Sequence, residues 1–221
     1  MQNVFSICTR FPGKREKPMN KQNSTIMKLA ETALLAALCY VSFTFLQIKI
    51  PVPGGDATSL HIGNTFCVLG ALLLGGWYGG LAGSIGMTIA DLMDPVYITG
   101  APKTFVLKLC IGLITGLVAH KIAKINETND KKYVFKWSLI ASIAGLAFNV
   151  IADPIVGYFY KQYILGQPQE AASILAKLSA GATFVNAIVS TILVVIIYNA
   201  VRPALIKANL IHVYVTAANA K

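Results

Sequence analysis

The sequence predicts an all-α integral membrane protein built as a bundle of six transmembrane helices. Of the 221 residues, 55% are hydrophobic and only 13% are charged, and the mean hydropathy is +0.62. Soluble domains typically contain about 25% charged residues, so a soluble protein of this composition would lack polar groups to cover its surface. The same apolar fraction excludes a disordered chain. The apolar residues also fall into six segments, which the following paragraphs take in order.

The first apolar segment covers residues 26–48, and its two charged residues, Lys28 and Glu31, lie at its start. A membrane-spanning helix needs about 20 mostly apolar residues, so this segment is long enough for one span. The prolines and glycines between residues 51 and 55 end this helix in a loop.

The next apolar stretch, residues 60–93, is too long for one span and is interrupted by glycines. We expect two short helices, over residues 61–75 and 78–93, joined by a tight turn. The glycines that interrupt the stretch are Gly75, Gly76, Gly79 and Gly80.

Three further apolar segments predict the remaining spans, over residues 104–122, 133–158 and 178–201. Pro203 is expected to close the last helix because proline cannot continue the hydrogen-bond ladder. An even number of spans places both termini on the same side of the membrane.

The basic residues predict which side this is. With cytoplasmic termini, 14 of the 19 Lys and Arg residues fall inside. Six lie in a basic arm (1–25) and the first helical turn after it, five in and beside the connection between the fourth and fifth spans, and three at Arg202 and in a tail (204–221). The positive-inside rule therefore favours N- and C-termini in the cytoplasm. We expect the arm to be disordered, and the net charge of +10 to orient the chain and contact anionic lipid headgroups rather than a nucleic acid. The basic residues expected outside are Lys49, Lys103, Lys108, Lys161 and Lys177.

Under this topology, polar side chains from five helices gather in one layer near the outer face of the membrane. Lys108 lies about 7.5 Å deeper than Lys103 at helical rise, and Asn149 and Asp153 share one helical face. Ionisable groups in a bilayer are costly and mark functional positions, and a small polar solute needs such convergent groups. The predicted pocket comprises His61, Asn64, Asp91, Lys103, Lys108, Asn149, Asp153, Tyr158 and Asn186.

Plainer interpretations of the same residues stay open. Asp91 and Asp94 could end a helix at the membrane interface, and Tyr158 could belong to an aromatic belt. Lys108 could instead form a structural pair with Asp91 or Asp153.

The chain shows no energy source of its own. It lacks the motif G-x-x-x-x-G-K-[ST], and no relay of carboxylates and histidines crosses the bilayer. Ala33 and Ala37 form a flat, small-residue face on the first helix, which suits close packing either within the chain or against a partner subunit.

Two other classes of function remain as alternatives. A secondary transporter acting alone would use Asp91, Asp153 and Lys108 as coupling groups. An intramembrane enzyme would need a nucleophile with a base or a set of histidines. The histidines fall on opposite sides of the membrane, and Ser84 lies in a small-residue helix face, so we expect no catalytic residue, metal or cofactor.

Several motifs together resemble the substrate-binding S components of energy-coupling factor (ECF) vitamin transporters, within the branch of riboflavin-type and pyridoxine- or hydroxymethylpyrimidine-type components. The resemblance covers residues 26–203. The motifs that carry it are Ser59 to Asn64, Ala71 to Gly75, Gly79 to Gly86, Asp91-Leu92, Ala101 to Phe105, Lys108 and Gly112.

The resemblance implies six helices in a prokaryotic cell membrane and a water-soluble vitamin bound near the outer face. It implies that Ala33 and Ala37 face a transmembrane coupling subunit (the T component), which joins two cytoplasmic ATPases. It also implies a gating loop between the first two helices, which here contains Pro51, Pro53, Gly54 and Gly55.

The ligand is predicted from the mixture of charges in the pocket. Lys103 and Lys108 would suit an anionic or phenolate-bearing ligand, whereas the acids would suit a protonated ring nitrogen. A flat heteroaromatic such as pyridoxine satisfies both, and we place it first. Pantothenate, riboflavin and hydroxymethylpyrimidine remain open.

Overall fold

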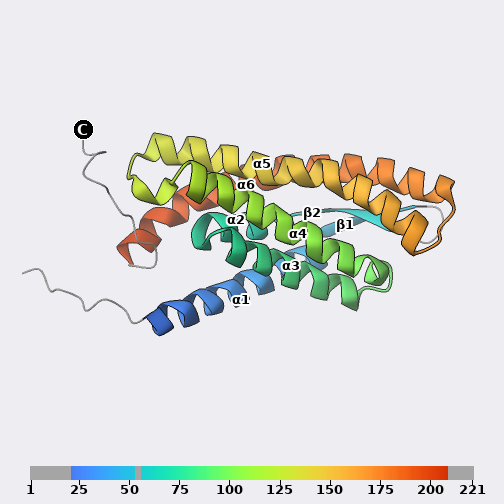
Figure 1. The fold of residues 1–221 in the computed structure, drawn as a ribbon, viewed down its shortest axis with the longest axis horizontal. Helices are drawn as coiled ribbons and strands as arrows, with labels where there is room; N and C mark the ends of the chain where they lie inside the picture. Colours follow the sequence, from blue (N-terminus) through green and yellow to red (C-terminus); the bar gives the residue numbers. More distant parts are fainter. Residues whose placement is uncertain (1–20, 53–55, 209–221) are drawn as a thin grey trace, which may run out of the picture.

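The chain folds into an elongated bundle of helices with one small β-hairpin (Figure 1). The computed structural model describes residues 21–52 and 56–208. Within this part the helices are α1 (Lys21–Phe45), α2 (Gly63–Leu74), α3 (Gly76–Met93), α4 (Ala101–Gly116), α5 (Lys131–Phe159) and α6 (Gln169–Lys207). The strands β1 (Gln47–Pro51) and β2 (Ala57–His61) form the hairpin, and π-helical turns η2 (Leu117–Ile122) and η4 (Tyr160–Ile164) extend α4 and α5.

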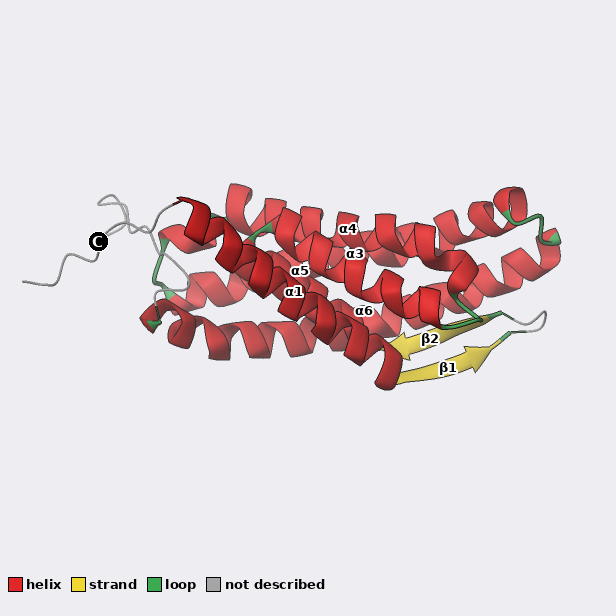
Figure 2. Cartoon of the chain, turned by 90° about the horizontal axis from the view of Figure 1, so that it is seen from below, coloured by secondary structure: helices red, strands yellow, loops and turns green. Residues whose placement is uncertain are grey.

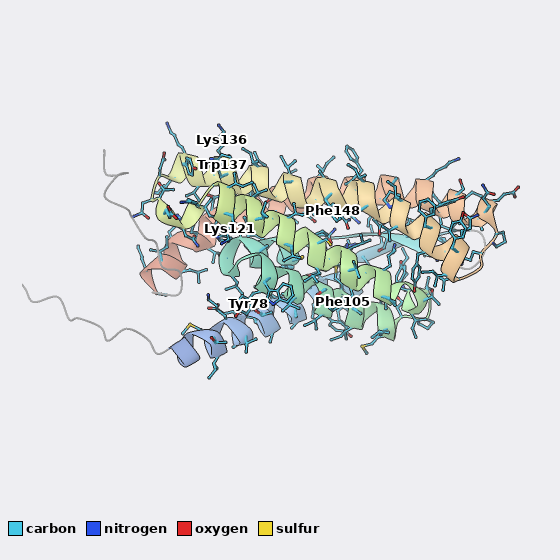
Figure 3. The ribbon with its side chains drawn as sticks, viewed as in Figure 1. Tyr78, Phe105, Lys121, Lys136, Trp137 and Phe148 are labelled. Atoms are coloured by element: carbon cyan, nitrogen blue, oxygen red, sulfur yellow. The ribbon has the colours of Figure 1, made fainter. Side chains whose placement is uncertain are left out.

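Both ends of the described chain lie at one end of the bundle, and the hairpin lies toward the other, which we call the hairpin end (Figures 1 and 2). This arrangement agrees with an even number of passes along the bundle. Lys121, Lys136 and Trp137 lie in the half nearer the chain ends, whereas Phe105 lies in the half nearer the hairpin (Figure 3).

Four helical segments of the described chain are long and apolar enough to cross a membrane: Thr25–Phe45, Ile98–Glu127, Lys131–Ile164 and Gln169–Lys207. This identifies a multi-pass helical membrane protein. The helix α2 has 12 residues, so at helical rise it is about 18 Å long, less than the roughly 30 Å hydrocarbon layer. Six full spans and cytoplasmic termini therefore stay predictions.

The hairpin occupies the end of the first expected span (26–48) and the loop expected after it. Its strands are antiparallel, with Ile48 opposite Leu60 and Ile50 opposite Thr58. Residues 47–51 alternate polar and apolar side chains, which is the period of a strand and is the signal that the loop assignment missed.

The predicted gating-loop residues fall partly on this hairpin. Pro51 is the last residue of β1, a position at a strand end that tolerates proline. Pro53, Gly54 and Gly55 lie outside the described residues.

The predicted break between α2 and α3 is confirmed, and a single residue, Gly75, separates the two helices. Gly75 has φ +97°, a left-handed conformation that favours glycine. The second helix, α3, begins two residues earlier than expected, at Gly76, and Gly79 and Gly80 lie inside it as predicted. There they permit close helix packing: a Cβ on Gly79 would lie 2.0 Å from the backbone nitrogen of Ala71.

The other helices agree with the expected spans in their centres and differ at their ends. The helix α1 includes residues 21–25 of the expected irregular arm, and residues 1–20 and 209–221 lie outside the described chain. The helix α6 is longer at both ends than expected and passes through Pro203. A proline near the end of a long helix removes one hydrogen bond but leaves most of the ladder intact.

Candidate binding site

A cavity of about 120 Å³ lies at the hairpin end, against β2 and between α4, α5 and α6. The segment that follows α3 completes its wall through Val96 and Tyr97. Six of the side chains predicted to form a pocket line this cavity, namely His61, Asp91, Lys103, Lys108, Asp153 and Asn186.

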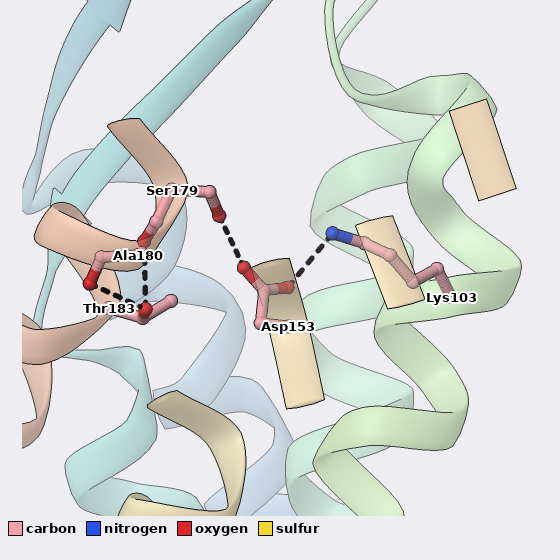
Figure 4. A network of polar contacts seen from close by, with 5 residues as sticks. All are labelled: Lys103, Asp153, Ser179, Ala180 and Thr183. Carbon is pink, nitrogen blue, oxygen red and sulfur yellow. Dashed lines mark hydrogen bonds and ion pairs between the residues drawn. The ribbon is translucent and has the colours of Figure 1, made fainter. Parts of the chain in front are cut away.

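A polar network joins three helices at one wall of the cavity (Figure 4). Lys103 Nζ of α4 lies 2.8 Å from Asp153 Oδ1 of α5, and the Ser179 hydroxyl of α6 donates to Asp153 Oδ2. Thr183 Oγ1 donates to the carbonyl oxygen of Ser179 at 2.7 Å. Both Asp153 oxygens are therefore engaged by the chain itself, and the ion pair that Asp153 forms is with Lys103 rather than Lys108.

Lys108 is the cation that this network leaves unpaired. Its side chain lines the cavity, and the residue is only 7% exposed. Within residues 21–52 and 56–208, its ammonium group makes no ion pair; Asp91 and Asp153 interact with it electrostatically without forming one. A buried charge costs several kcal/mol unless a partner compensates it. A ligand carrying an acceptor or an anionic group would supply that partner.

Asp91 provides a negative charge in the same cavity. It lies near the end of α3, is 3% exposed, and also forms no ion pair in the described part of the chain. The cavity therefore presents one cation and one carboxylate that are not joined to each other by an ion pair. Such a site suits a small ligand with groups of both signs.

His61 adds a neutral hydrogen-bonding group. Its Nδ1 accepts a hydrogen bond from the backbone N–H of Gly63 at 3.2 Å. Burial, and to a smaller extent the positive charge of Lys108, lowers the pKa of His61 to about 3, so the imidazole is neutral near pH 7. The proton of a neutral imidazole with an accepting Nδ1 is on Nε2, which makes this nitrogen a donor. The ring also packs edge-on against Phe43 at a centroid distance of 4.7 Å.

Asn186 lines the cavity but is occupied by the hairpin. Its Oδ1 accepts from the His61 backbone N–H at 3.0 Å, and its Nδ2 donates to the Ser59 carbonyl at 3.0 Å. The side-chain amide thus pairs with β2 as a neighbouring strand would, and it fixes that end of the strand to α6.

The other three predicted pocket residues do not line the cavity. Asn64 and Asn149 are each 1% exposed in the helix packing, and in the described part of the chain their Oδ1 atoms have no hydrogen-bond partner. Tyr158 lies in a shallow outer groove beside Lys177, and its ring is 5.3 Å from that of Phe159. Five residues beyond Asp153, it falls on a different face of α5.

Several residues that line the cavity were missed by the sequence analysis. Tyr160 and Lys161 follow Asp153 by seven and eight residues, so helical periodicity could have found them. Ser179 and Thr183 precede Asn186 on the same face of α6, which is a similar signal. Asp56 lies outside any helix, and no periodicity indicates it.

Two small residues of α1, Ala33 and Ala37, lie on its outer surface. Ala33 and Ala37 are exposed, and between and beside them Leu34 and Leu38 are 64% and 36% exposed. This face is therefore available to a partner in the membrane, which internal packing would have excluded.

These features define a helical membrane protein that holds a polar cavity near one end of its bundle. The family model of the ECF-type riboflavin transporter S component matches residues 23–203, and the chain belongs to this family. Its members are substrate-binding subunits of transporters rather than enzymes.

A solved structure of ThiT from Listeria monocytogenes is similar in fold, with a TM-score of 0.62 and 21% sequence identity. The match covers 83% of this chain and 98% of that one. No curated protein matches the chain.

Proposed function

We propose that the chain captures a small water-soluble vitamin from the outer side of the cell membrane and delivers it through an ATP-driven partner module. The observation that carries this proposal is the unpaired Lys108 in a cavity that also holds Asp91 and His61. A buried charge without a partner destabilises the empty protein, and a ligand that supplies the partner offsets this cost.

The cavity favours a single-ring ligand. A water-sized occupant takes about 10–15 Å³ of such space, so a cavity of about 120 Å³ holds on the order of 8–12 of them. Pyridoxine is of this size, and its phenolate and ring nitrogen would face Lys108 and Asp91. We place it first.

Riboflavin, which the family is named for, is the second candidate. Its three fused rings and its side chain would need a wider cavity than the one described. Hydroxymethylpyrimidine fits by size but offers no anionic group to Lys108, and pantothenate offers an anion but no cationic ring nitrogen to Asp91.

The partner is expected on α1. The exposed face of Ala33 and Ala37 allows another helix to approach closely. We propose that a transmembrane T component packs there and connects the chain to two cytoplasmic ATPases, whose hydrolysis of ATP would drive release of the vitamin.

Calorimetric titration of the purified chain with pyridoxine, pantothenate, riboflavin and hydroxymethylpyrimidine tests the proposal. Saturable binding of pyridoxine, tighter than that of the other three, is the expected result. Absence of binding to all four would overturn the proposed function, and preferential binding of riboflavin would overturn the assignment by size.

A control separates this function from the alternative of a secondary transporter. Vesicles containing the chain alone should show no uptake under an ion gradient, and uptake should require the coupling module and ATP. Uptake driven by the gradient alone would favour the alternative.

A further inference from the structure

The hairpin is attached to the bundle at both ends of β2. At the end of the strand, Asn186 of α6 holds the backbone of Ser59 and His61. Just before its start, the Asp56 carboxylate accepts hydrogen bonds from Lys161 Nζ and, at 2.8 Å, from Gln167 Nε2. We call Asp56, Lys161 and Gln167 the clasp.

The clasp forms part of the cavity wall. Asp56 and Lys161 both line the cavity, and their side chains are only 16% and 13% exposed. They join the start of β2 to η4 and to the connection between α5 and α6, which are more than 100 residues away in the sequence.

A second ion pair joins the hairpin to the bundle, but it is more exposed than the clasp and lies away from the cavity. Lys49 of β1 pairs with Asp94 after α3, but its side chain is 43% exposed, and neither residue lines the cavity. Solvent and salt screen an exposed pair more strongly than a buried one. Of these two ion pairs, the clasp is therefore the one that lines the cavity.

We propose that the clasp sets the residence time of the bound vitamin, because the ligand leaves only when the Asp56–Lys161 pair separates. This proposal rests on the proposed function. Asn186 keeps one end of β2 on α6 through two hydrogen bonds to the backbone. Separation of the clasp would therefore free the Asp56 end while the other end stays attached. Asp56, Lys161 and Gln167 are positioning residues that act through the hairpin, since Lys161 Nζ and Gln167 Nε2 both donate to the Asp56 carboxylate.

Dissociation kinetics of pyridoxine from the full chain test the clasp. Asp56→Asn and Lys161→Gln each remove one charge of the pair with little change in size, and we expect dissociation about tenfold faster in both. The double variant Asp56→Lys with Lys161→Asp restores the pair in reverse and should return the rate toward that of the wild type.

Matched controls come from the ion pair at the other end of the bundle. Lys124 and Glu127 are 3.6 Å apart and exposed, and they lie in the connection between α4 and α5, away from the cavity. Lys124→Gln and Glu127→Gln make the same chemical changes and should leave dissociation unchanged. Wild-type dissociation rates in both Asp56→Asn and Lys161→Gln would overturn the proposal.

Amide hydrogen exchange without ligand provides an independent readout. The Val52 amide donates to the Asp56 carbonyl at 2.8 Å, and amides of β1 and β2 report on opening of the hairpin. Faster exchange of these amides in Asp56→Asn, reversed in the charge-swapped double variant, supports the clasp even if pyridoxine does not bind. Unchanged exchange would contradict the clasp and would leave the proposed function intact.

Discussion

Replacing Lys108 with methionine removes a buried positive charge and keeps an unbranched side chain of similar length. Lys108 is 7% exposed, lines the cavity, and has no ion-pair partner in the described chain. A hydrogen bond to a charged group contributes about 1.5–3 kcal/mol, and about 1.4 kcal/mol corresponds to a tenfold change in Kd. We therefore expect Lys108→Met to bind pyridoxine roughly 10- to 150-fold more weakly, as measured by calorimetric titration.

The same substitution should stabilise the protein without ligand. An unpaired buried charge costs several kcal/mol, and an apolar side chain of similar volume avoids that cost. The thermal unfolding midpoint of Lys108→Met in detergent should therefore be higher than that of the wild type. Lys177, exposed on α6 and outside the cavity, provides the control: Lys177→Met should change neither quantity appreciably.

The two measurements together can refute this reasoning. Wild-type affinity in Lys108→Met would mean that the ammonium group does not contact the ligand. A lower unfolding midpoint would mean that Lys108 forms a structural ion pair with Asp91 or Asp153, the plainer interpretation of the sequence.

Three further predictions concern the partner face, the imidazole and the polar network. Tryptophan at Ala33 or Ala37 should abolish transport by the assembled complex and leave vitamin affinity intact; loss of affinity would show that this face packs internally. The free energy of unfolding should fall as the pH drops below about 6.5, because unfolded histidine gains a proton there while buried His61, with its pKa lowered to about 3, does not. His61→Gln should reduce this loss in pH-dependent unfolding, and an unchanged pH dependence would contradict the assignment. Asp153→Asn should lower the unfolding midpoint, because it leaves Lys103 without its partner, and an equal or higher midpoint would argue against a structural ion pair.

The positions of the long apolar segments were sufficient to predict most of the fold. The apolar segments located the centres of all six helices, and the break at Gly75 was visible because glycines interrupt a stretch that is too long for one span. The helix ends were predicted less well, since α6 continues through Pro203 and α1 begins within the polar arm. Tertiary packing rather than composition decides such boundaries.

For the candidate site, the sequence indicates how deep each side chain lies in the membrane but not which neighbours it contacts. Asp91, Lys103 and Lys108, which were grouped by their depth along the helices, line one cavity. Depth alone does not give the side of the helix that faces the cavity, and Tyr158 lies at a suitable depth on another face of α5. The pairing of Asp56 with Lys161 joins distant segments, and no local pattern reveals it.

Mass spectrometry of the small molecules released from the purified chain tests the central claim most directly. The wild-type protein should carry a single-ring vitamin of the pyridoxine type in near-stoichiometric amount, and Lys108→Met prepared in parallel should carry much less. Equal amounts of the vitamin in both proteins would contradict the account. The account would also be contradicted if neither protein carried a bound compound and the titrations showed no binding.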